Sequence, residues 1–597
     1  MSTYQDRLAA LREELARRRL DGFVVPLTDE HMSEYVGAYA QRLAWLTGFQ
    51  GSAGSAVVLP AEAAIFVDGR YTLQVREQVD ETHWSYQSVP QTSTAEWLEK
   101  HAPDGARIGY DPWLHTRGWV KSARKALGAR GAELVAVDTN PVDAVWPDRP
   151  LPSDARLIVQ PDLLAGRSSA EKRQEIADWL IRKKADAAVL SALDSIAWTF
   201  NVRGADVDHT PVALAYALVN ADGTADLFVA PEKIGDDVAQ HLGNAVRLHP
   251  RDAFAGHLAS LKGKRVVADP ERAVSAIFAR LDAAGATVVE LRDPAVLPKA
   301  IKNAAEIAGQ DAAQARDGAA LTRFLHWLSV EAPKGNVDEL TASDKLEAFR
   351  AETGALKDLS FDTISGAGPN GAVVHYRASE ETNRRLELNS LYLVDSGAQY
   401  QDGTTDVTRT VAIGTPTNEM RDRFTRVLKG HIALARAVFP QGTRGSQLDT
   451  LARQYLWAVG LDYAHGTGHG VGSFLAVHEG PQRISPGSAG FAGGDEPLQA
   501  GMILSNEPGY YKTGEYGIRI ENLVLVERRD APGAEKELLG FRTLTFAPLD
   551  RRLIDLAMLT AEERAWVDGY HAQVAAIVAP QLDGAAAAWL KAETAPL

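Results

Sequence analysis

Asp395 and Asp406 stand within residues 393–410, LVDSGAQYQDGTTDVTRT, a stretch whose apolar residues around these two acids predict buried strands. Asp395 and Asp406 each adjoin a valine, and a buried carboxylate without a partner is costly, so either both acids face water or a cation holds them. Eleven positions separate them in the sequence. A hairpin that turns near Asp402 and Gly403 would place them on adjacent strands, where one or two cations could bridge both.

Three residues downstream could complete a metal site. His469 lies in HGTGHG, Glu507 in NEPGYY and Glu521 in GIRIEN, each in a strand-like or glycine-flanked context. Oxygen and nitrogen ligands without sulfur suit manganese, iron, cobalt or zinc, and four carboxylates offset most of the charge of two divalent ions. Two such ions about 3.5 to 4 Å apart can share and ionise one water, so the pattern predicts a dinuclear hydrolase that attacks a peptide carbonyl.

Three more histidines occur near these motifs: His375 in GAVVHYR, His465 at the start of HGTGHG, and His478 in LAVHEGP. An imidazole has an ordinary pKa near about 6.5, which suits proton transfer at neutral pH. These side chains could donate to the carbonyl oxygen as it becomes an oxyanion, or carry a proton to the leaving nitrogen.

Each residue taken alone also has a structural interpretation. Either aspartate could be a turn or cap residue, and Glu507 could be a loop carboxylate. Glu521 could form a salt bridge with Arg519 on an edge strand, and each histidine could fill a structural role. The order and context of the residues taken together favour the metal site.

The chain divides at three places into the segments that must position these residues. The proline-rich stretch at residues 140–152 cannot continue a helix or lie within a sheet, and helical spacing of apolar residues begins again near residue 303. A single core stops growing near about 250 to 300 residues, so a chain of this length should hold about three domains. We predict an α/β (α+β) protein with α/β domains at residues 1–150 and 151–302, a catalytic domain at 303–540, and a C-terminal helical extension at 541–597.

The composition excludes several classes of function. The chain has 597 residues, is 45% hydrophobic and 24% charged, and contains no apolar run near the length of about 20 residues that a membrane span needs. Its formal net charge of −15 argues against a nucleic-acid partner, because phosphate binding requires a basic surface. It has no cysteine, and its first twenty residues predict a charged amphipathic helix instead of a signal peptide. We therefore expect a cytoplasmic protein that contacts neither nucleic acid nor membrane.

The order Asp, Asp, His, Glu, Glu in these contexts resembles the pita-bread metallopeptidases, which include methionine aminopeptidase, prolidase and aminopeptidase P. The resemblance implies a pita-bread catalytic domain that binds two metal ions. The implied ligands are Asp395, Asp406, His469, Glu507 and Glu521. Asp406 and Glu521 are implied to bridge both ions, and Glu507 to take a proton from the shared water.

The resemblance also assigns the residues around the ligands. It implies that His375, His465 and His478 bind the substrate carbonyl and shuttle protons, which makes them catalytic residues together with Glu507. Arg519, beside Glu521, is a further candidate for substrate binding. The tyrosines 510, 511 and 516 are candidates for the lining of a substrate pocket.

Length and further motifs favour one branch of the family. Two α/β domains similar to the creatinase amino-terminal domain, the helical extension, and stretches such as RLAWLTGFQGSAG, FVDGRYTLQV and AWTFNVRGADVDHTPV resemble the long, three-domain cytosolic aminopeptidase P. This resemblance implies removal of the first residue of peptides with proline in second position, a preference for manganese with zinc or cobalt as alternatives, and a homodimer. A prolidase restricted to dipeptides and a non-catalytic peptide-binding protein of the same fold are the rival hypotheses.

Overall fold

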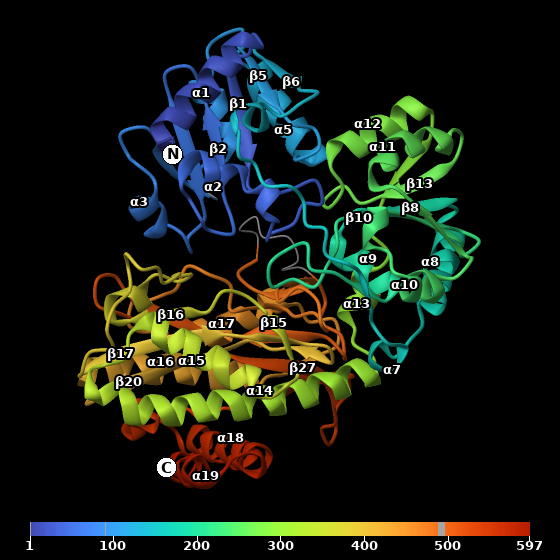
Figure 1. Cartoon of the computed structure of the whole chain (residues 1–597). Coiled ribbons are helices and arrows are strands. Elements are labelled where there is room, and N and C mark those ends of the chain that lie inside the picture. Colours follow the sequence, from blue (N-terminus) through green and yellow to red (C-terminus); the bar gives the residue numbers. More distant parts are fainter. Residues whose placement is uncertain (1, 90, 488–495) are drawn as a thin grey trace. The chain divides into compact units, whose positions relative to one another are not determined.

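The computed structural model describes residues 2–89, 91–487 and 496–597 (Figure 1). The chain divides into two compact units, unit 1 at Met1–Val296 and unit 2 at Leu297–Leu597. Both units combine helices with strands, which confirms the predicted α/β class. Among the described residues, no helix has the length and apolar character needed to cross a bilayer. The boundaries of the four predicted segments remain predictions.

Unit 1 contains two six-stranded sheets that share one topology. Its strands are β1 (Gly22–Pro26), β2 (Ser55–Val58), β3 (Ala63–Val67), β4 (Ser85–Ser88), β5 (Arg107–Tyr110), β6 (Glu133–Ala136), β7 (Ile158–Val159), β8 (Ala187–Leu190), β9 (Val202–Arg203), β10 (Ala215–Asn220), β11 (Ala225–Val229), β12 (Val246–His249), β13 (Arg265–Ala268) and β14 (Thr287–Glu290). The sheet orders are β4-β3-β2-β1-β5-β6 and β12-β11-β10-β8-β13-β14. In both sheets the central strand, β1 or β8, pairs antiparallel on one side and parallel on the other.

Several helices of unit 1 begin at a residue whose side chain caps the first turn. They are α1 (Tyr4–Arg17), α2 (Arg42–Thr47), α3 (Gln74–Gln78), α4 (Thr94–His101), α5 (Arg117–Gly128), α6 (Pro141–Val145), α7 (Asp162–Ala165), α8 (Ser169–Lys183), α9 (Leu193–Phe200), α10 (Asp236–Leu242), α11 (Phe254–His257) and α12 (Ser275–Ala284). Thr3 and Ser168 each form a capping box with the acid three residues later, which satisfies two free amide groups at the start of α1 and α8. Leucines 8, 11 and 15 then form the buried face of α1.

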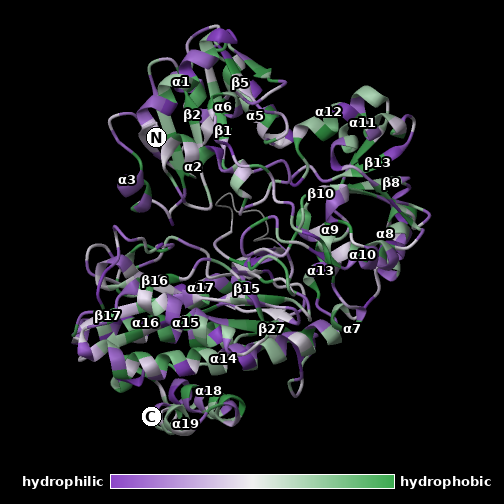
Figure 2. Cartoon of the chain, in the orientation of Figure 1, coloured by the Kyte–Doolittle hydropathy of each residue, from purple (hydrophilic) through white to green (hydrophobic). Residues whose placement is uncertain are grey.

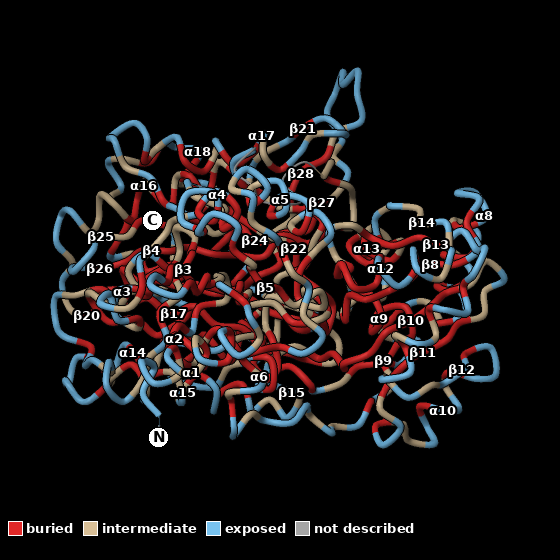
Figure 3. Tube along the Cα trace, turned by 90° about the horizontal axis from the view of Figure 1, so that it is seen from above, coloured by how far each residue is buried: buried red, intermediate tan, exposed pale blue. Residues whose placement is uncertain are grey.

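Unit 2 is built around a six-stranded sheet and smaller sheets beside it. Its strands are β15 (Leu356–Leu359), β16 (Ile364–Ala367), β17 (Ser390–Ser396), β18 (Ala398–Tyr400), β19 (Gly403–Thr404), β20 (Val407–Ile413), β21 (Val438–Pro440), β22 (Gly468–Gly470), β23 (Glu479–Ile484), β24 (Ile503–Asn506), β25 (Gly509–Lys512), β26 (Tyr516–Arg519), β27 (Asn522–Arg529) and β28 (Leu538–Thr543). The large sheet has the order β21-β28-β27-β24-β22-β23, and β16-β17-β20 form a second sheet. Figure 3 shows buried residues along the strands and exposed residues mainly in the loops.

Helices of different lengths pack on these sheets. They are α13 (Val296–Ala300), α14 (Ala304–Glu331), α15 (Glu339–Ala351), α16 (Asn418–Ala435), α17 (Gly445–Trp457), α18 (Ala561–Val578) and α19 (Gly584–Glu593). Figure 2 shows hydrophilic and hydrophobic residues alternating along α14, whose apolar side packs with α15 on β17 and β20. The C-terminal helices α18 and α19 pack beside α14 (Figure 1). Val567, Val574 and Val578 of α18 are fully buried in the core of unit 2.

Candidate active site

The two aspartates lie at neighbouring positions of an antiparallel strand pair. Asp395 is in β17 and Asp406 directly precedes β20, with Ser396 paired to Val407. The connection folds into the short strands β18 and β19, which pair Tyr400 with Gly403 around the predicted turn. Asp395 and Asp406 are only 7% and 3% exposed, so neither acid is solvated as an ordinary turn residue would be.

His469 approaches this pair from β22 in the large sheet. Its Nε2 lies 3.4 Å from Oδ2 of Asp406 and 3.5 Å from Oε1 of Glu507. Its other ring nitrogen, Nδ1, lies 2.9 Å from the carbonyl oxygen of Gly470, to which it can only donate. That hydrogen bond leaves the lone pair of neutral His469 on Nε2, which faces the carboxylates.

The two glutamates come from the ends of paired strands. Glu507 follows β24 and Glu521 precedes β27, and the residues beside them, Asn506 and Asn522, are direct partners across these strands. The hydroxyl of Ser505 donates to Oε1 of Glu507 at 3.1 Å. Glu521 is 1% exposed. The pairing of β24 with β27 therefore brings both glutamates to the same end of this strand pair.

Burial and crowding perturb the protonation of this cluster. Burial raises the pKa of Asp395 to about 6 even though the Arg519 guanidinium opposes the shift, and it raises the pKa of Glu507 to about 7. The pKa of Glu521 lies well above its usual range because of burial and the neighbouring acids. Burial disfavours the imidazolium of His469, but the hydrogen bond to Asp406 and the charge of Glu507 outweigh it and raise that pKa to about 9. In the metal-free protein these side chains therefore carry protons, which a bound cation would displace.

The donor set fits hard divalent metal ions. Ligand atoms of Asp406, His469 and Glu521 all lie within 4.8 Å of one another. Oδ1 of Asp395 is buried and lacks a hydrogen-bond partner among the described residues, although such orphaned oxygens are rare in proteins. A cation next to Asp395 would satisfy that oxygen, and carboxylate and imidazole are the ligands that manganese, cobalt and zinc accept.

Arg519 contradicts one structural interpretation of the sequence. Its Nη2 donates to Oδ2 of Asp395 at 2.6 Å, so its carboxylate partner is Asp395 and not Glu521. Nor is the segment after it an edge strand, because β27 pairs with β24 on one side and β28 on the other. The alternative interpretation of Glu521, a salt bridge with Arg519 on an edge strand, is therefore wrong, because it took both partners from the same local segment.

The other predicted histidines occupy different positions around this cluster. The His478 ring lies 4.3 Å from the His469 ring, centroid to centroid, at 71°. His465 accepts a hydrogen bond at Nε2 from the hydroxyl of Tyr511 at 2.8 Å, since its Nδ1 donates to the carbonyl oxygen of Gly466. His375 is partly buried in the turn after the 3-10 helix Gly368–Ala372, which packs against β17 and β26.

Comparisons with known proteins agree with this geometry. Residues 309–528 match the model of metallopeptidase family M24, and residues 537–597 match the C-terminal region of peptidase M24. Residues 7–145 and 148–306 each match a creatinase/prolidase N-terminal domain.

Curated relatives match over almost the whole chain. A probable Xaa-Pro aminopeptidase P of Laccaria bicolor is 42% identical over 612 residues, which cover 99% of this chain and 93% of the relative. One of Paracoccidioides brasiliensis is 42% identical over 615 residues, which cover 99% of both chains. The chain belongs to the Xaa-Pro aminopeptidases P of metallopeptidase family M24.

A solved relative extends the match to three dimensions. The X-prolyl aminopeptidase of Caenorhabditis elegans, described as a cytosolic enzyme with a di-nuclear active site, superposes with a TM-score of 0.94 at 35% identity and full coverage of both chains. Family, fold class and metallopeptidase class, as predicted from the motifs, are thereby confirmed.

Sequence reasoning missed Thr408, which contacts a proposed ligand of this site. Thr408 donates to Oε2 of Glu521 at 2.7 Å and lies 3.2 Å from Nε of Arg519. Of the tyrosines suggested for a substrate pocket, Tyr511 accepts from Arg519 at 2.6 Å, whereas Tyr510 and Tyr516 belong to the apolar core of unit 2. Thr408 could have been found from period-two alternation, because it shares a strand face with Asp406.

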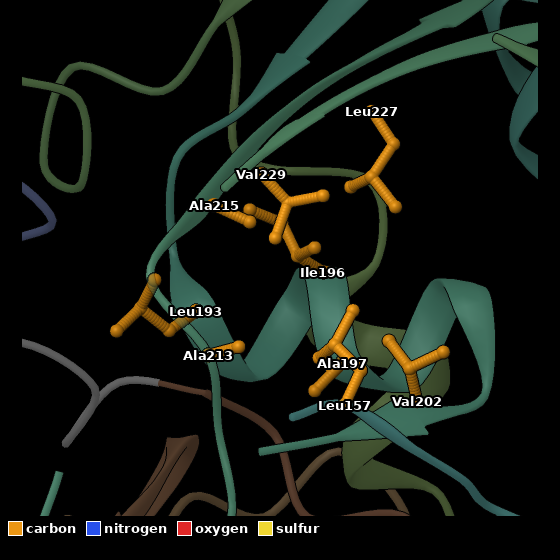
Figure 4. A pocket seen from close by; sticks show the side chains of 9 residues that line it. All are labelled: Leu157, Leu193, Ile196, Ala197, Val202, Ala213, Ala215, Leu227 and Val229. Carbon is orange, nitrogen blue, oxygen red and sulfur yellow. The ribbon is translucent and has the colours of Figure 1, made fainter. Parts of the chain in front are cut away.

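A pocket in unit 1 is lined only by apolar side chains. Figure 4 shows its lining side chains gathered around α9, β10 and β11. They are Leu157, Leu193, Ile196, Ala197, Val202, Ala213, Ala215, Leu227 and Val229. Ligand sites combine apolar walls with a few polar groups, so this pocket is not a candidate for the aminopeptidase site.

Proposed function

We propose that this protein removes the N-terminal residue from peptides whose second residue is proline, using two divalent metal ions. The proposed ligands are Asp395, Asp406, His469, Glu507 and Glu521. The observation that carries the proposal is the convergence of Asp406, His469 and Glu521, from three distant segments, into one buried cluster of ligand atoms. When bound there, two metal ions would polarise a water molecule and the substrate carbonyl.

The side chains of the cluster have distinct roles. We assign Glu507 as the general base, because one of its oxygens is held by Ser505 and its pKa of about 7 in the metal-free protein permits proton uptake near neutral pH. Asp406 and Glu521 are assigned as bridging ligands. Arg519 holds Asp395 in place through Oδ2 and leaves Oδ1 for a cation.

The histidines are assigned to the substrate. His478, in ring contact with His469, would donate to the substrate carbonyl oxygen as negative charge develops on it. His465 accepts from the hydroxyl of Tyr511 at Nε2, so it would bind the substrate carbonyl only after it takes up a proton there and exchanges Tyr511 for the substrate. His375 is assigned to proton transfer toward the leaving nitrogen. Arg519 contacts Tyr511 and Asp395, so its role in substrate binding is indirect and runs through Tyr511.

The substrate class has a physical rationale. The bond between any residue and proline is a tertiary amide, so the proline nitrogen has no hydrogen to donate and its ring restricts the preceding residue. A peptidase that grips an extended backbone through that N–H therefore loses one contact. A dedicated site must recognise the free amino group and the proline ring instead.

Metal identity, assembly and location complete the proposal. We propose manganese as the native metal, with zinc or cobalt as alternatives, because oxygen-rich sites without sulfur suit all three. A homodimer in the cytoplasm is proposed from the family resemblance and from the relative of Caenorhabditis elegans, which is described as cytosolic. Sedimentation velocity tests the dimer, and adding back each metal to metal-free protein tests the preference.

One substitution tests the centre directly. Asp406→Asn removes a charged ligand while keeping the side-chain volume, and it should abolish hydrolysis of Arg-Pro-Pro in buffer with manganese while the circular dichroism stays native. Asp402→Asn is the matched control, because Asp402 lies on the same hairpin but pairs with Arg316 away from the ligands. Near-normal turnover by Asp406→Asn would refute the ligand assignment. Cleavage of Gly-Pro but not Arg-Pro-Pro by the native protein would favour a prolidase.

A further inference from the structure

Two consecutive residues of β20 hold Glu521 in different ways. Thr408 donates its hydroxyl to Oε2 of Glu521, whereas Arg409 donates from Nη1 to the backbone carbonyl oxygen of Glu521 at 2.7 Å. Side chains alternate along a strand, so Arg409 leaves β20 on the side opposite Thr408. Arg409 is 1% exposed. The backbone of Glu521 is therefore anchored from behind by a fully buried guanidinium.

The buried guanidinium of Arg409 depends on a complete set of acceptors. Its acceptors are the carbonyl oxygens of Thr408, Glu521, Ala547 and Pro548, Oδ1 of Asn522, and the hydroxyl oxygen of Tyr570. All of these oxygens are uncharged, and burying a cation is costly unless its hydrogen bonds are made. The planar fork of arginine fixes the direction of each bond, so a shift of one acceptor moves the others.

Tyr570 is the member of this set that comes from the C-terminal helix α18. Its hydroxyl accepts from Nη2 of Arg409 at 2.8 Å and can donate to the carbonyl oxygen of Ala547 at 2.8 Å. The same Nη2 donates at 2.9 Å to Asn522, the residue directly after Glu521. Through one hydroxyl, α18 thus contacts the group that holds both Glu521 and its neighbour.

A second contact from α18 supports the other glutamate. Trp566 packs edge-on against the His431 ring at 5.8 Å, centroid to centroid. Nδ1 of His431 donates to the carbonyl oxygen of Asn506 at 3.1 Å, and its Nε2 accepts from the amide nitrogen of Asn522 at 3.3 Å. Asn506 directly precedes Glu507. Helix α18 therefore lies behind the strand pair that carries both glutamates.

We propose that helix α18 positions the glutamate ligands, and that Tyr570 is a positioning residue which acts on Glu521 through Arg409. The inference rests on the proposed metal centre. It assigns a role in metal binding to the C-terminal helical extension predicted at residues 541–597. Partners that orient a ligand typically change metal affinity or activity by about 10- to 100-fold when they are removed.

Tyr570→Phe tests the proposal because it removes the hydroxyl and keeps the ring. We expect native circular dichroism, about tenfold weaker binding of manganese in calorimetric titration of the metal-free protein, and a lower kcat with KM unchanged within about twofold. Glu563→Gln is the matched control. Glu563 lies on the same helix as Tyr570, two turns before it, and its substitution breaks an ion pair with Lys429 of α16, so this variant should bind manganese like the native protein within about twofold.

Arg409→Lys provides a second variant that keeps the positive charge. It should weaken manganese binding at least as much as Tyr570→Phe. The double variant should bind no more weakly than Arg409→Lys alone, because both changes break the same chain of hydrogen bonds from Tyr570 through Arg409 to Glu521. Native manganese affinity in Tyr570→Phe, or equal losses in Tyr570→Phe and Glu563→Gln, would overturn the proposal. If too little Tyr570→Phe folds, Arg409→Lys with native affinity overturns it equally. A native protein that binds none of manganese, zinc and cobalt would instead refute the proposed function.

Discussion

Metal binding at the proposed centre should tighten as the pH rises, because several of its ligands, His469 and Glu507 among them, hold protons in the metal-free protein. The pKa of His469 is raised to about 9, since the hydrogen bond to Asp406 and the charge of Glu507 outweigh burial, and burial raises the pKa of Glu507 to about 7. Both groups must be deprotonated to bind a metal. A bound metal therefore displaces protons throughout the neutral range.

The size of the effect follows from the number of protons displaced. Each one changes the dissociation constant about tenfold per pH unit below the pKa of its group. His469 stays protonated across the range from about pH 6 to pH 8, so its proton alone should tighten binding about 100-fold, or about 2.7 kcal/mol. Glu507 steepens the dependence below about pH 7, where it too holds a proton.

Calorimetric titration of metal-free protein with manganese at several pH values measures this dependence. Repeating each titration in buffers of different ionisation enthalpy counts the released protons directly. His469→Gln supplies the control, since it should bind more weakly and lose about one proton from the count. A dissociation constant that changes less than about threefold over two pH units, without proton release, would refute the reasoning.

Three further predictions concern stability and are checked by urea unfolding. Leu428→Ala empties a fully buried position between α16 and the core of unit 2 and should lower the free energy of unfolding by about 2 to 5 kcal/mol; a loss below about 1 kcal/mol would contradict it. Gly430→Ala should cost about 1 to 3 kcal/mol despite better helix propensity, because its Cβ would collide with the carbonyl oxygen of Ala452 on α17; a gain in stability would disprove that contact. Burial lowers the pKa of His115 from its ordinary 6.5 to about 4, so the native state favours the neutral ring. Its contribution of about 3 kcal/mol is present above about pH 6.5 and lost as the pH falls toward about 4, and His115→Gln should flatten that dependence.

The parts of the fold that could be predicted from the sequence are the helices and hairpins that local residue patterns set. The helix at Ala304–Glu331 follows from the helical spacing of its apolar residues, and its capping box at Asn303 marks the start. The hairpin between β17 and β20 follows from strand patterns on both sides of a turn at Asp402 and Gly403. These features depend on residues within a few turns or strand positions of one another.

The contacts of the candidate site could be predicted only in part from such local patterns. Five ligand candidates could be named because carboxylates and imidazole stand where apolar residues would be expected, in an order that resembles a known family. The partner of Arg519 could not be named correctly, because Asp395 is 124 positions away and only the packing of β26 on β17 brings them together. The role of Tyr570 could not be recognised in the sequence, because a tyrosine in an amphipathic helix has the pattern of a core residue.

By itself, the sequence determined the class of chemistry and the strands that carry it, because ligand types and strand alternation are local properties of the chain. Only the tertiary structure decided which groups share a contact: Arg519 with Asp395, Thr408 with Glu521, and Tyr570 with Arg409. Such contacts join segments more than 100 positions apart. They depend on strand register and on helix docking, whose free energies come from the packing of the whole unit and not from any single segment.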